Sequence, residues 1–198
     1  MSQHYYSRRP RRRGSRRLIG CFLRGVTVEF YVYPGVFSVD EVDEGTRLLV
    51  ENAIVPEDGV VLDMGCGYGV IGVTLAKRYP RLRVVMVDVN PSAVELARMN
   101  ARLNRVEDRV EVLLGDLYGP VEGRVFDAII SNPPMSAGMR VVEGIIRGAP
   151  RHLRRGGWLE LVVRRGAERV ARVMEEVFGG VEVLARKHGY RVLASRLG

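Results

Sequence analysis

Residues 60–69 read VVLDMGCGYG, an apolar run with one carboxylate that ends in three alternating glycines. The first five residues predict a buried strand, because turn residues bound the apolar run on both sides. Asp63 then lies near the carboxyl end of this strand. A helix is expected over about residues 70–79, so the glycines form a turn at the carboxyl edge of a sheet, where open α/β folds bind ligands. Gly65 and Gly67 can adopt positive φ, and without a Cβ they let a ligand approach the backbone.

Strand and helix patterns alternate after this turn, which predicts a mainly parallel sheet covered by helices on both faces. The last two strands have only a short link, so we expect them to be antiparallel to each other. The sequence therefore predicts a Rossmann-like α/β fold with a seven-stranded, mainly parallel sheet and a C-terminal antiparallel strand. The expected strands cover residues 60–64, 82–87, 109–114, 126–131, 158–163, 181–185 and 190–194, and the expected helices cover residues 46–53, 70–79, 91–103, 139–153 and 167–178.

The start of the chain differs in composition from the rest. The net charge is +8, and residues 1–17 hold seven arginines and no acid, so the remaining chain is nearly neutral. We expect residues 1–17 to be a disordered tail that contacts RNA phosphates, or alternatively a terminus that only aids solubility. Alternating residues then predict a β hairpin over residues 18–35, which opens a single domain over residues 18–198.

The overall composition limits the possible classes of protein. The chain has 198 residues, of which 46% are hydrophobic, enough for one substantial core. No apolar run approaches the roughly 18 residues that a membrane helix needs, and the arginine-rich start is no convincing signal peptide, so we expect a cytoplasmic protein and no membrane partner. Cys21 and Cys66 lack metal-ligand spacing and are expected to be packing residues, and no metal site is predicted.

Two classes of adenosine-containing ligand fit the glycine turn. The pattern D-x-G-x-G-x-G at residues 63–69 resembles motif I of the class I S-adenosylmethionine (SAM) methyltransferases. Gly67, Gly69 and Gly72 also match G-x-G-x-x-G, the pattern of dinucleotide-binding folds. Asp88, at the end of the second predicted strand, could bind two ribose hydroxyls of either ligand. A glycine-rich turn without any ligand is the simpler alternative. It does not explain why both acids and the glycines fall at the ends of predicted strands.

The segment Asn132-Pro133-Pro134-Met135 follows the fourth predicted strand, where a substrate could meet the cofactor. Prolines have no N–H, so this loop offers carbonyl acceptors in a stiff frame. The Asn132 side-chain oxygen and the Pro133 carbonyl could each accept one N–H of an exocyclic amine, which directs the nitrogen toward a sulfonium methyl. Such positioning is worth about 7–11 kcal/mol. An ordinary turn at the end of a strand is the alternative.

No general base is required for this chemistry, because the amine loses its proton after it becomes cationic. Consistent with this, we interpret the three histidines as solvated or structural residues, namely His4, His152 and His188.

Several short motifs occur together in this chain: Asp63-Met64-Gly65-Cys66-Gly67, Asp88, Asp116-Leu117 and Ser131-Asn132-Pro133-Pro134, supported by Val36-Phe37-Ser38, Gly45-Thr46 and Gly138-Met139. Their combination resembles the methyltransferase small-domain family, which includes the ribosomal RNA guanine-N2 methyltransferases of C type, and most of all its stand-alone archaeal members. The likeness covers about residues 30–196.

The resemblance implies SAM as the cofactor and assigns roles to individual positions. Gly65 and Gly67 would approach the methionine portion of SAM, Asp88 its ribose, and Asp116 the adenine amine with Leu117 packed nearby. The expected cofactor contacts are Phe37, Thr46, Asp63, Gly65, Cys66, Gly67, Asp88, Val89, Asp116, Leu117 and Asn132, with Phe37, Thr46 and Asp63 toward the methionyl end, and the expected catalytic residues are Asn132, Pro133, Pro134 and Met135.

Two features depart from the family pattern. Phe or Tyr usually follows the second proline and stacks on the target base, whereas this chain has Met135. A thioether still contacts a ring, at about 0.3–1.5 kcal/mol. The bacterial enzymes of this type also carry a second domain that recruits substrate, and we expect the hairpin and the arginine-rich tail to substitute for it here.

These observations predict a SAM-dependent N-methyltransferase that modifies an exocyclic amine in RNA, with guanine N2 of ribosomal RNA as the favoured target. A protein glutamine amide or adenine N6 are alternative targets for the same chemistry. Two other classes remain open: a nicotinamide-dependent oxidoreductase that uses the G-x-G-x-x-G glycines, and an RNA-binding module without catalysis. The sequence does not indicate an oligomeric state.

Overall fold

The computed structural model describes residues 16–33, 41–133 and 138–198. Most of the predicted tail therefore lies outside the described residues, and so do Phe37, Pro134 and Met135. The strands are β1 (Arg17–Leu23), β2 (Val26–Val32), β3 (Asp58–Met64), β4 (Arg81–Asp88), β5 (Val110–Leu114), β6 (Phe126–Ser131), β7 (Leu153–Val163), β8 (Glu182–Lys187) and β9 (Tyr190–Arg196). The helices are α1 (Glu44–Asn52), α2 (Val70–Arg78), α3 (Pro91–Leu103), α4 (Met139–Gly148) and α5 (Ala167–Phe178), with two short 3₁₀ helices, η1 (Gly119–Val121) and η3 (Ala149–Arg151).

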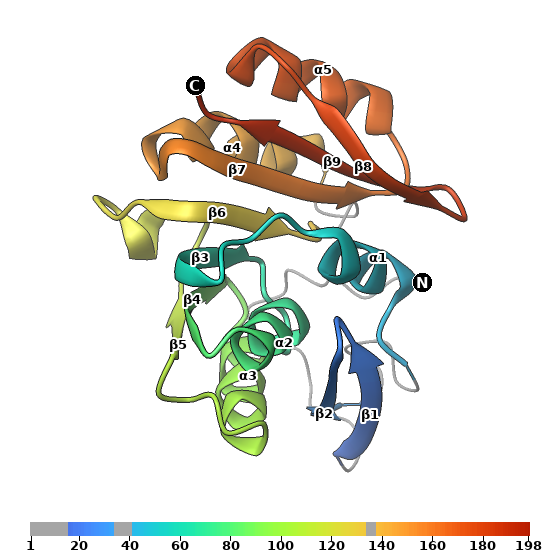
Figure 1. Cartoon of the computed structure of the whole chain (residues 1–198), viewed down its shortest axis with the longest axis vertical. Helices are drawn as coiled ribbons and strands as arrows, with labels where there is room; N and C mark the ends of the chain where they lie inside the picture. The colour runs from blue at the N-terminus through green and yellow to red at the C-terminus, as the bar shows by residue number, and fades with distance from the viewer. Residues whose placement is uncertain (1–15, 34–40, 134–137) are drawn as a thin grey trace.

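Within the described residues, seven strands form one sheet in the order β5-β4-β3-β6-β7-β9-β8. The pairs β3–β4, β3–β6, β4–β5 and β6–β7 are parallel, whereas β9 is antiparallel to both of its neighbours. The predicted Rossmann-like fold is confirmed, including the antiparallel strand near the C-terminus and the separate N-terminal hairpin of β1 and β2 (Figure 1).

Both faces of the sheet are buried. Successive residues of β3 point to opposite faces, so Val61 belongs to one buried cluster and Leu62 to the other. The first cluster contains residues of α1, α2, α3 and the hairpin, and the second contains residues of α4, α5 and η1. This burial on two sides is why the central strands are continuous apolar runs instead of alternating ones. No helix among the described residues is long and apolar enough to span a membrane.

The β1–β2 hairpin is fixed to the helical layer by hydrogen bonds to its backbone (Figure 1). Asn100 of α3 accepts the Tyr31 N–H at 2.8 Å and donates to the Tyr31 carbonyl at 3.1 Å. Asn104 pairs with both backbone groups of Glu29 in the same way. These amide side chains therefore complete the free edge of β2.

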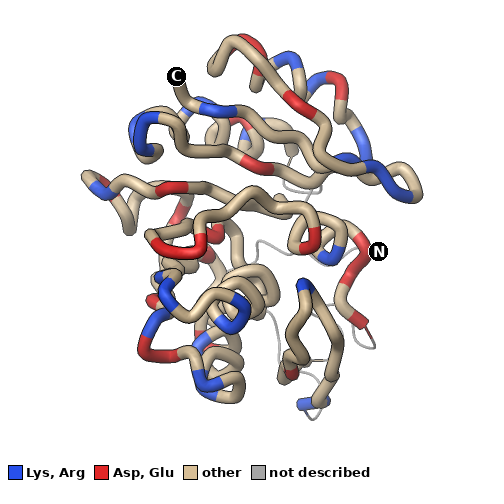
Figure 2. The backbone as a smooth tube through the Cα atoms, viewed as in Figure 1, with Lys and Arg blue, Asp and Glu red and all other residues tan. Residues whose placement is uncertain are grey.

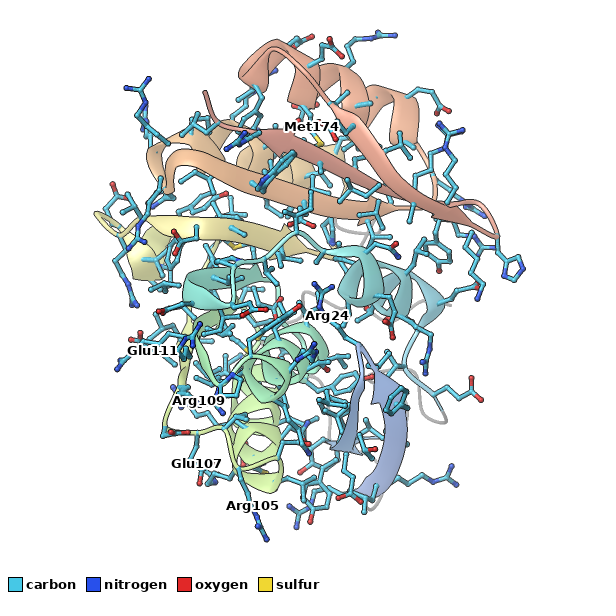
Figure 3. The ribbon with its side chains drawn as sticks, in the orientation of Figure 1. Arg24, Arg105, Glu107, Arg109, Glu111 and Met174 are labelled. Carbon is cyan, nitrogen blue, oxygen red and sulfur yellow. The ribbon has the colours of Figure 1, made fainter. Side chains whose placement is uncertain are left out.

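Arg24 lies between the hairpin and the helices in Figure 3, and it donates to the carbonyls of Val50 and Ala53.

The helix predicted over residues 139–153 is too long. Helix α4 ends at Gly148, because Pro150 has no N–H to continue it, and β7 already begins at Leu153. The Gly156-Gly157 pair therefore lies within a strand and does not end a helix. A Cβ on Gly157 would lie 2.9 Å from the carbonyl oxygens of Arg154 and Asp127, so glycine is needed where this irregular part of β7 passes β6.

Candidate active site

A cleft lies at the carboxyl ends of the central strands, as the order of the parallel strands requires. Its empty volume is about 430 Å³, including space that is open to solvent. The walls come from β3, β4 and β6, from the turns that follow these strands and β5, and from one face of α4. The lining residues are Met64, Gly65, Val87, Asp88, Val89, Gly115, Asp116, Leu117, Ser131, Pro133, Val141 and Ile145.

The glycine turn between β3 and α2 forms one wall of this cleft. The N–H groups of Gly65 and Cys66 both donate to the carbonyl of Val87, at 2.8 and 3.0 Å, which anchors the turn to the end of β4. Gly65 and Gly67 have φ of 73° and 57°, values that favour glycine. A Cβ on Gly65 would have no atom within 4 Å, so the backbone there is open to a ligand.

Gly72, the third glycine of the G-x-G-x-x-G match, has a different function. It lies inside α2, and a Cβ there would come 2.3 Å from the Met86 sulfur. It therefore allows the helix to pack closely on β4 and does not contact the cleft.

Asp88 holds two turns together at the floor of the cleft. Its Oδ2 accepts the Gly67 N–H and its Oδ1 accepts the Asn90 N–H, each at 2.8 Å. Burial raises the pKa of this carboxyl, and the backbone donors offset part of that shift. The Val89 N–H is a third backbone donor to this carboxylate, and since a carboxylate has about four acceptor sites, Asp88 can still accept a hydrogen bond from a hydroxyl group of a ligand.

Asp63 and Cys66 are buried behind the glycine turn and do not line the cleft. Asp63 accepts the Gly72 N–H at 3.0 Å through Oδ2, and its Oδ1 has no partner among the described residues. Burial and, to a smaller extent, the charge of Asp88 raise its pKa to about 7, against the opposing effect of the Gly72 N–H. Burial, with the two neighbouring carboxylates, also raises the pKa of the Cys66 thiol, so this cysteine is a packing residue in the structure.

The turns after β4 and β5 form a further wall of the cleft. Val89, Asp116 and Leu117 lie there, and Leu117 has an unusual positive φ of 47°. Val141 and Ile145 of α4 complete this wall. These two residues were not predicted as site residues from the sequence, although their spacing of four residues places them on one helical face.

Asn132 lies just after β6, and two groups from the start of α1 hold its side chain. Its Nδ2 donates to Thr46 Oγ1 at 2.7 Å and to Asp43 Oδ1 at 3.1 Å. The Thr46 hydroxyl in turn donates to Asp43 Oδ2. Asp43 also caps α1 by accepting the Thr46 N–H at 3.0 Å. Both amide hydrogens of Asn132 are thereby occupied, and its Oδ1 is left as the acceptor.

Thr46 was predicted to lie beside the cofactor, and Asp43 was not predicted as a site residue. Structurally, Thr46 contacts Asn132, and Asp43 completes the same network. A carboxylate directly before a helix is a common cap, so the sequence offers no separate signal for its second contact. Pro133 lines the cleft, while Pro134, Met135 and Phe37 lie outside the described residues.

His152 and His188, the two histidines that the structure describes, do not line the cleft. His152 is buried, stacks on Tyr118 with ring centroids 4.4 Å apart, and lies 3.0 Å from the Arg124 carbonyl through Nδ1. His188 is exposed and pairs with Glu44. Among the residues that the structure describes, no three His, Cys, Asp or Glu side chains gather as a metal site.

Comparison with known proteins places these residues in context. The family model of the methyltransferase small domain matches residues 27–194. YbxB of Bacillus subtilis (strain 168), an uncharacterized protein, is 37% identical over 200 residues, with 99% of both chains covered. Ribosomal RNA small subunit methyltransferase C of an Escherichia coli O7:K1 strain is 40% identical over 172 residues, which cover 85% of this chain and 48% of that protein.

Two solved structures show the same architecture. One is the Thermus thermophilus 16S rRNA N2 methyltransferase RsmC in complex with AdoMet and guanosine, with a TM-score of 0.83 and 27% identity over 96% of this chain and 52% of that one. The other is a Pyrococcus furiosus methyltransferase with a TM-score of 0.66 and 21% identity, which shows the fold alone. This chain thus spans about half the length of the ribosomal RNA methyltransferases that it matches.

Proposed function

Because this chain belongs to the methyltransferase small-domain family and is a SAM-dependent methyltransferase, we propose that it methylates ribosomal RNA, at the exocyclic N2 amine of a guanine. The relatives named above support this proposal, since they include ribosomal RNA methyltransferases and a structure that binds AdoMet and guanosine. The substrate assignment implies a protein that acts in the cytoplasm, where ribosomal RNA is found.

The residues of the cleft fit SAM. Gly65 leaves open backbone where the methionine portion would lie, and the Asp88 carboxylate keeps acceptor capacity for a ribose hydroxyl. The Asp116 carboxylate could accept the adenine amine, with Leu117, Val141 and Ile145 providing an apolar wall for the ring. When bound, SAM supplies a methyl group that is activated by a positively charged sulfur.

The target amine would be held by Asn132 and Pro133. The single observation that carries the proposal is the fixed carboxamide of Asn132, whose two N–H groups are occupied by Asp43 and Thr46. Its oxygen, with the Pro133 carbonyl, could therefore accept the two amine hydrogens and stabilise positive charge as it develops on nitrogen. No residue needs to remove a proton beforehand, because the cationic product loses its proton to water.

The first experiment identifies the cofactor and the modified nucleoside. Calorimetric titration should show binding of SAM and none of NAD. Incubation with methyl-labelled SAM and unmodified small-subunit ribosomal RNA, followed by nucleoside analysis, should yield N2-methylguanosine. Recovery of N6-methyladenosine, or of methylated glutamine in a ribosomal or release-factor preparation, would replace guanine N2 as the target.

The second experiment tests the carboxamide. Asn132→Ala should lower the transfer rate at saturating SAM by on the order of 10²-fold, because it removes one acceptor of the amine. Asn52→Ala is a matched control, since Asn52 lies exposed at the end of α1, where its side chain donates to the Leu48 carbonyl. A transfer rate of Asn132→Ala equal to that of Asn52→Ala would contradict the proposed role.

A further inference from the structure

The β8–β9 hairpin ends in a tight turn close to the candidate active site. Lys187 pairs with Tyr190 across the hairpin, and the two residues between them, His188 and Gly189, both have positive φ, at 45° and 84°. Two left-handed residues form the turn type that matches the twist of a hairpin. The tip is therefore a defined structural element, and it projects beyond the sheet at the right of Figure 1.

Positive charge gathers at this tip, and Figure 2 shows it as a group of blue segments at the β8–β9 turn. Carboxylates balance part of that charge: Glu44 pairs with Lys187 at 3.6 Å, and Glu168 pairs with Arg191 at 2.7 Å. Arg164 and Arg186 are exposed, and within the described part of the chain neither of them makes an ion pair. We name these four cations, Arg164, Arg186, Lys187 and Arg191, the hairpin basic cluster.

Aromatic packing helps to hold one of these arginines. The Arg164 guanidinium lies 5.3 Å from the centroid of the Tyr190 ring, and Tyr190 is only partly buried. An arginine that stacks on a ring keeps its planar face occupied while its N–H groups remain free to donate. Such an arginine suits bidentate contact with a phosphate.

The hairpin basic cluster adjoins the residues that fix Asn132. Glu44, which contacts Lys187 and His188, directly follows Asp43. The Tyr190 ring lies against Gly45, where a Cβ would come 2.7 Å from its Cε1. Gly45 directly precedes Thr46, and both Asp43 and Thr46 bond the Asn132 carboxamide. A polyanion bound at the hairpin would therefore run past the target-amine site.

We infer that the hairpin basic cluster binds the phosphate backbone of the substrate RNA beside the nucleotide to be methylated. This inference rests on the proposed function for the identity of the polyanion. It assigns RNA recruitment to a folded surface, separate from the arginine-rich residues 1–17. Phosphate contacts of this kind position a substrate and carry little sequence information.

The test compares Arg164→Gln/Arg186→Gln with a control of equal charge, Arg83→Gln/Arg105→Gln, in the full chain. Arg83 and Arg105 are exposed and make no ion pair within the described residues, and Figure 3 shows Arg105 at the end of the molecule away from the hairpin. The probe is a fluorescein-labelled hairpin RNA from the small-subunit ribosomal RNA, followed by anisotropy between about 50 and 200 mM salt.

The hairpin double variant should bind the probe on the order of tenfold more weakly at 0.1 M salt, and its salt slope should fall by about 1.4 to 1.8, as expected for two lost phosphate contacts. KM for RNA should rise while kcat at saturating RNA and SAM affinity stay unchanged. Wild-type binding by this variant, or an equal loss in the control, would overturn the inference. If the hairpin double variant lost binding to polyglutamate but kept wild-type binding to RNA, the inference would also be overturned, because an acidic protein partner would then be indicated.

These outcomes separate the inference from the proposed function. If the wild-type protein methylates no RNA but the hairpin variant still loses RNA binding, the surface stands and the proposed reaction fails. If the wild-type protein methylates guanine and the hairpin variant binds RNA normally, the proposed reaction stands and the inferred RNA-binding surface fails.

Discussion

The Asn132 carboxamide nitrogen donates to the Thr46 hydroxyl oxygen at 2.7 Å, across 86 residues of sequence. This contact joins the end of β6 to the first turn of α1, and Asp43 completes it by binding both side chains. The orientation of the proposed amine acceptor thus depends on two residues that need not touch the substrate. Thr46 and Asp43 are positioning residues in this arrangement.

Thr46→Val should reduce kcat without changing SAM affinity. Valine keeps the shape of threonine but removes the acceptor for Asn132, and a typical hydrogen bond contributes about 0.5–1.5 kcal/mol, which corresponds to about a 2- to 12-fold lower rate. Steady-state kinetics with saturating RNA and SAM measure this effect. Thr74→Val is the matched control, because Thr74 Oγ1 is buried in α2 without a hydrogen-bond partner among the described residues. Equal rates for the two variants would contradict the positioning role.

Gly65→Ala should abolish most SAM binding. Gly65 has φ of 73° and lines the cleft, so alanine would add a Cβ where the cofactor is proposed to lie. Gly123→Ala is the matched control: Gly123 has φ of 75°, has no atom within 4 Å of an added Cβ, and is not part of the cleft. Each variant should lose about 1–2 kcal/mol of stability from left-handed strain. Calorimetry should then show a loss of SAM affinity for Gly65→Ala alone; retained affinity would place the cofactor elsewhere.

The sequence predicted the strands, their mainly parallel arrangement and the ligand-binding edge of the sheet, because those depend on local patterns. Apolar runs end in Asp63, Asp88 and Ser131, and parallel strands bring their carboxyl ends to one edge, so the glycine turn and Asn132 had to meet there. Gly65, Asp88, Leu117 and Pro133 line the cleft as expected.

The remaining details depend on tertiary packing. The motif predicts a cofactor contact for Asp63, and the structure adds what the motif does not show, namely that its side chain lies buried beneath α2 and accepts the Gly72 N–H. Asp43 looks like an ordinary helix cap in the sequence, and only the approach of α1 to β6 gives it a second partner. The error at Gly156-Gly157 has the same origin, because close backbone approach to Asp127 cannot be read from a pair of glycines.

Deletion of residues 1–15 tests the predicted arginine-rich tail. Arg17 belongs to β1, so the deletion stops before the hairpin and removes five arginines. Weaker RNA binding is expected, with a salt slope lower by about 3.5 to 4.5 if every arginine neutralises a phosphate. The anisotropy assay described above measures it, and unchanged affinity and slope would show that the tail does not contact RNA. Combined with the hairpin double variant, the losses in log affinity should add if the two sets of contacts are independent.

Glu160→Gln should stabilise the protein at neutral and alkaline pH. Glu160 is fully buried on β7, its two oxygens share the Ile54 N–H at 3.0 Å, and burial raises its pKa from 4.5 to about 8. The folded protein therefore holds this proton more tightly than the unfolded chain does, so the wild type loses stability as pH rises from about 4.5 to 8.

Glutamine keeps the acceptor for Ile54 and carries no titrating charge, so the variant should lack this loss, which amounts to about 1.4 kcal/mol per pH unit inside that window. Chemical denaturation of both proteins at pH 4 to 9 measures the difference, and Glu111→Gln, an exposed residue of β5, is the control. Parallel stability curves for wild type and Glu160→Gln would show that Glu160 does not retain its proton in the folded protein.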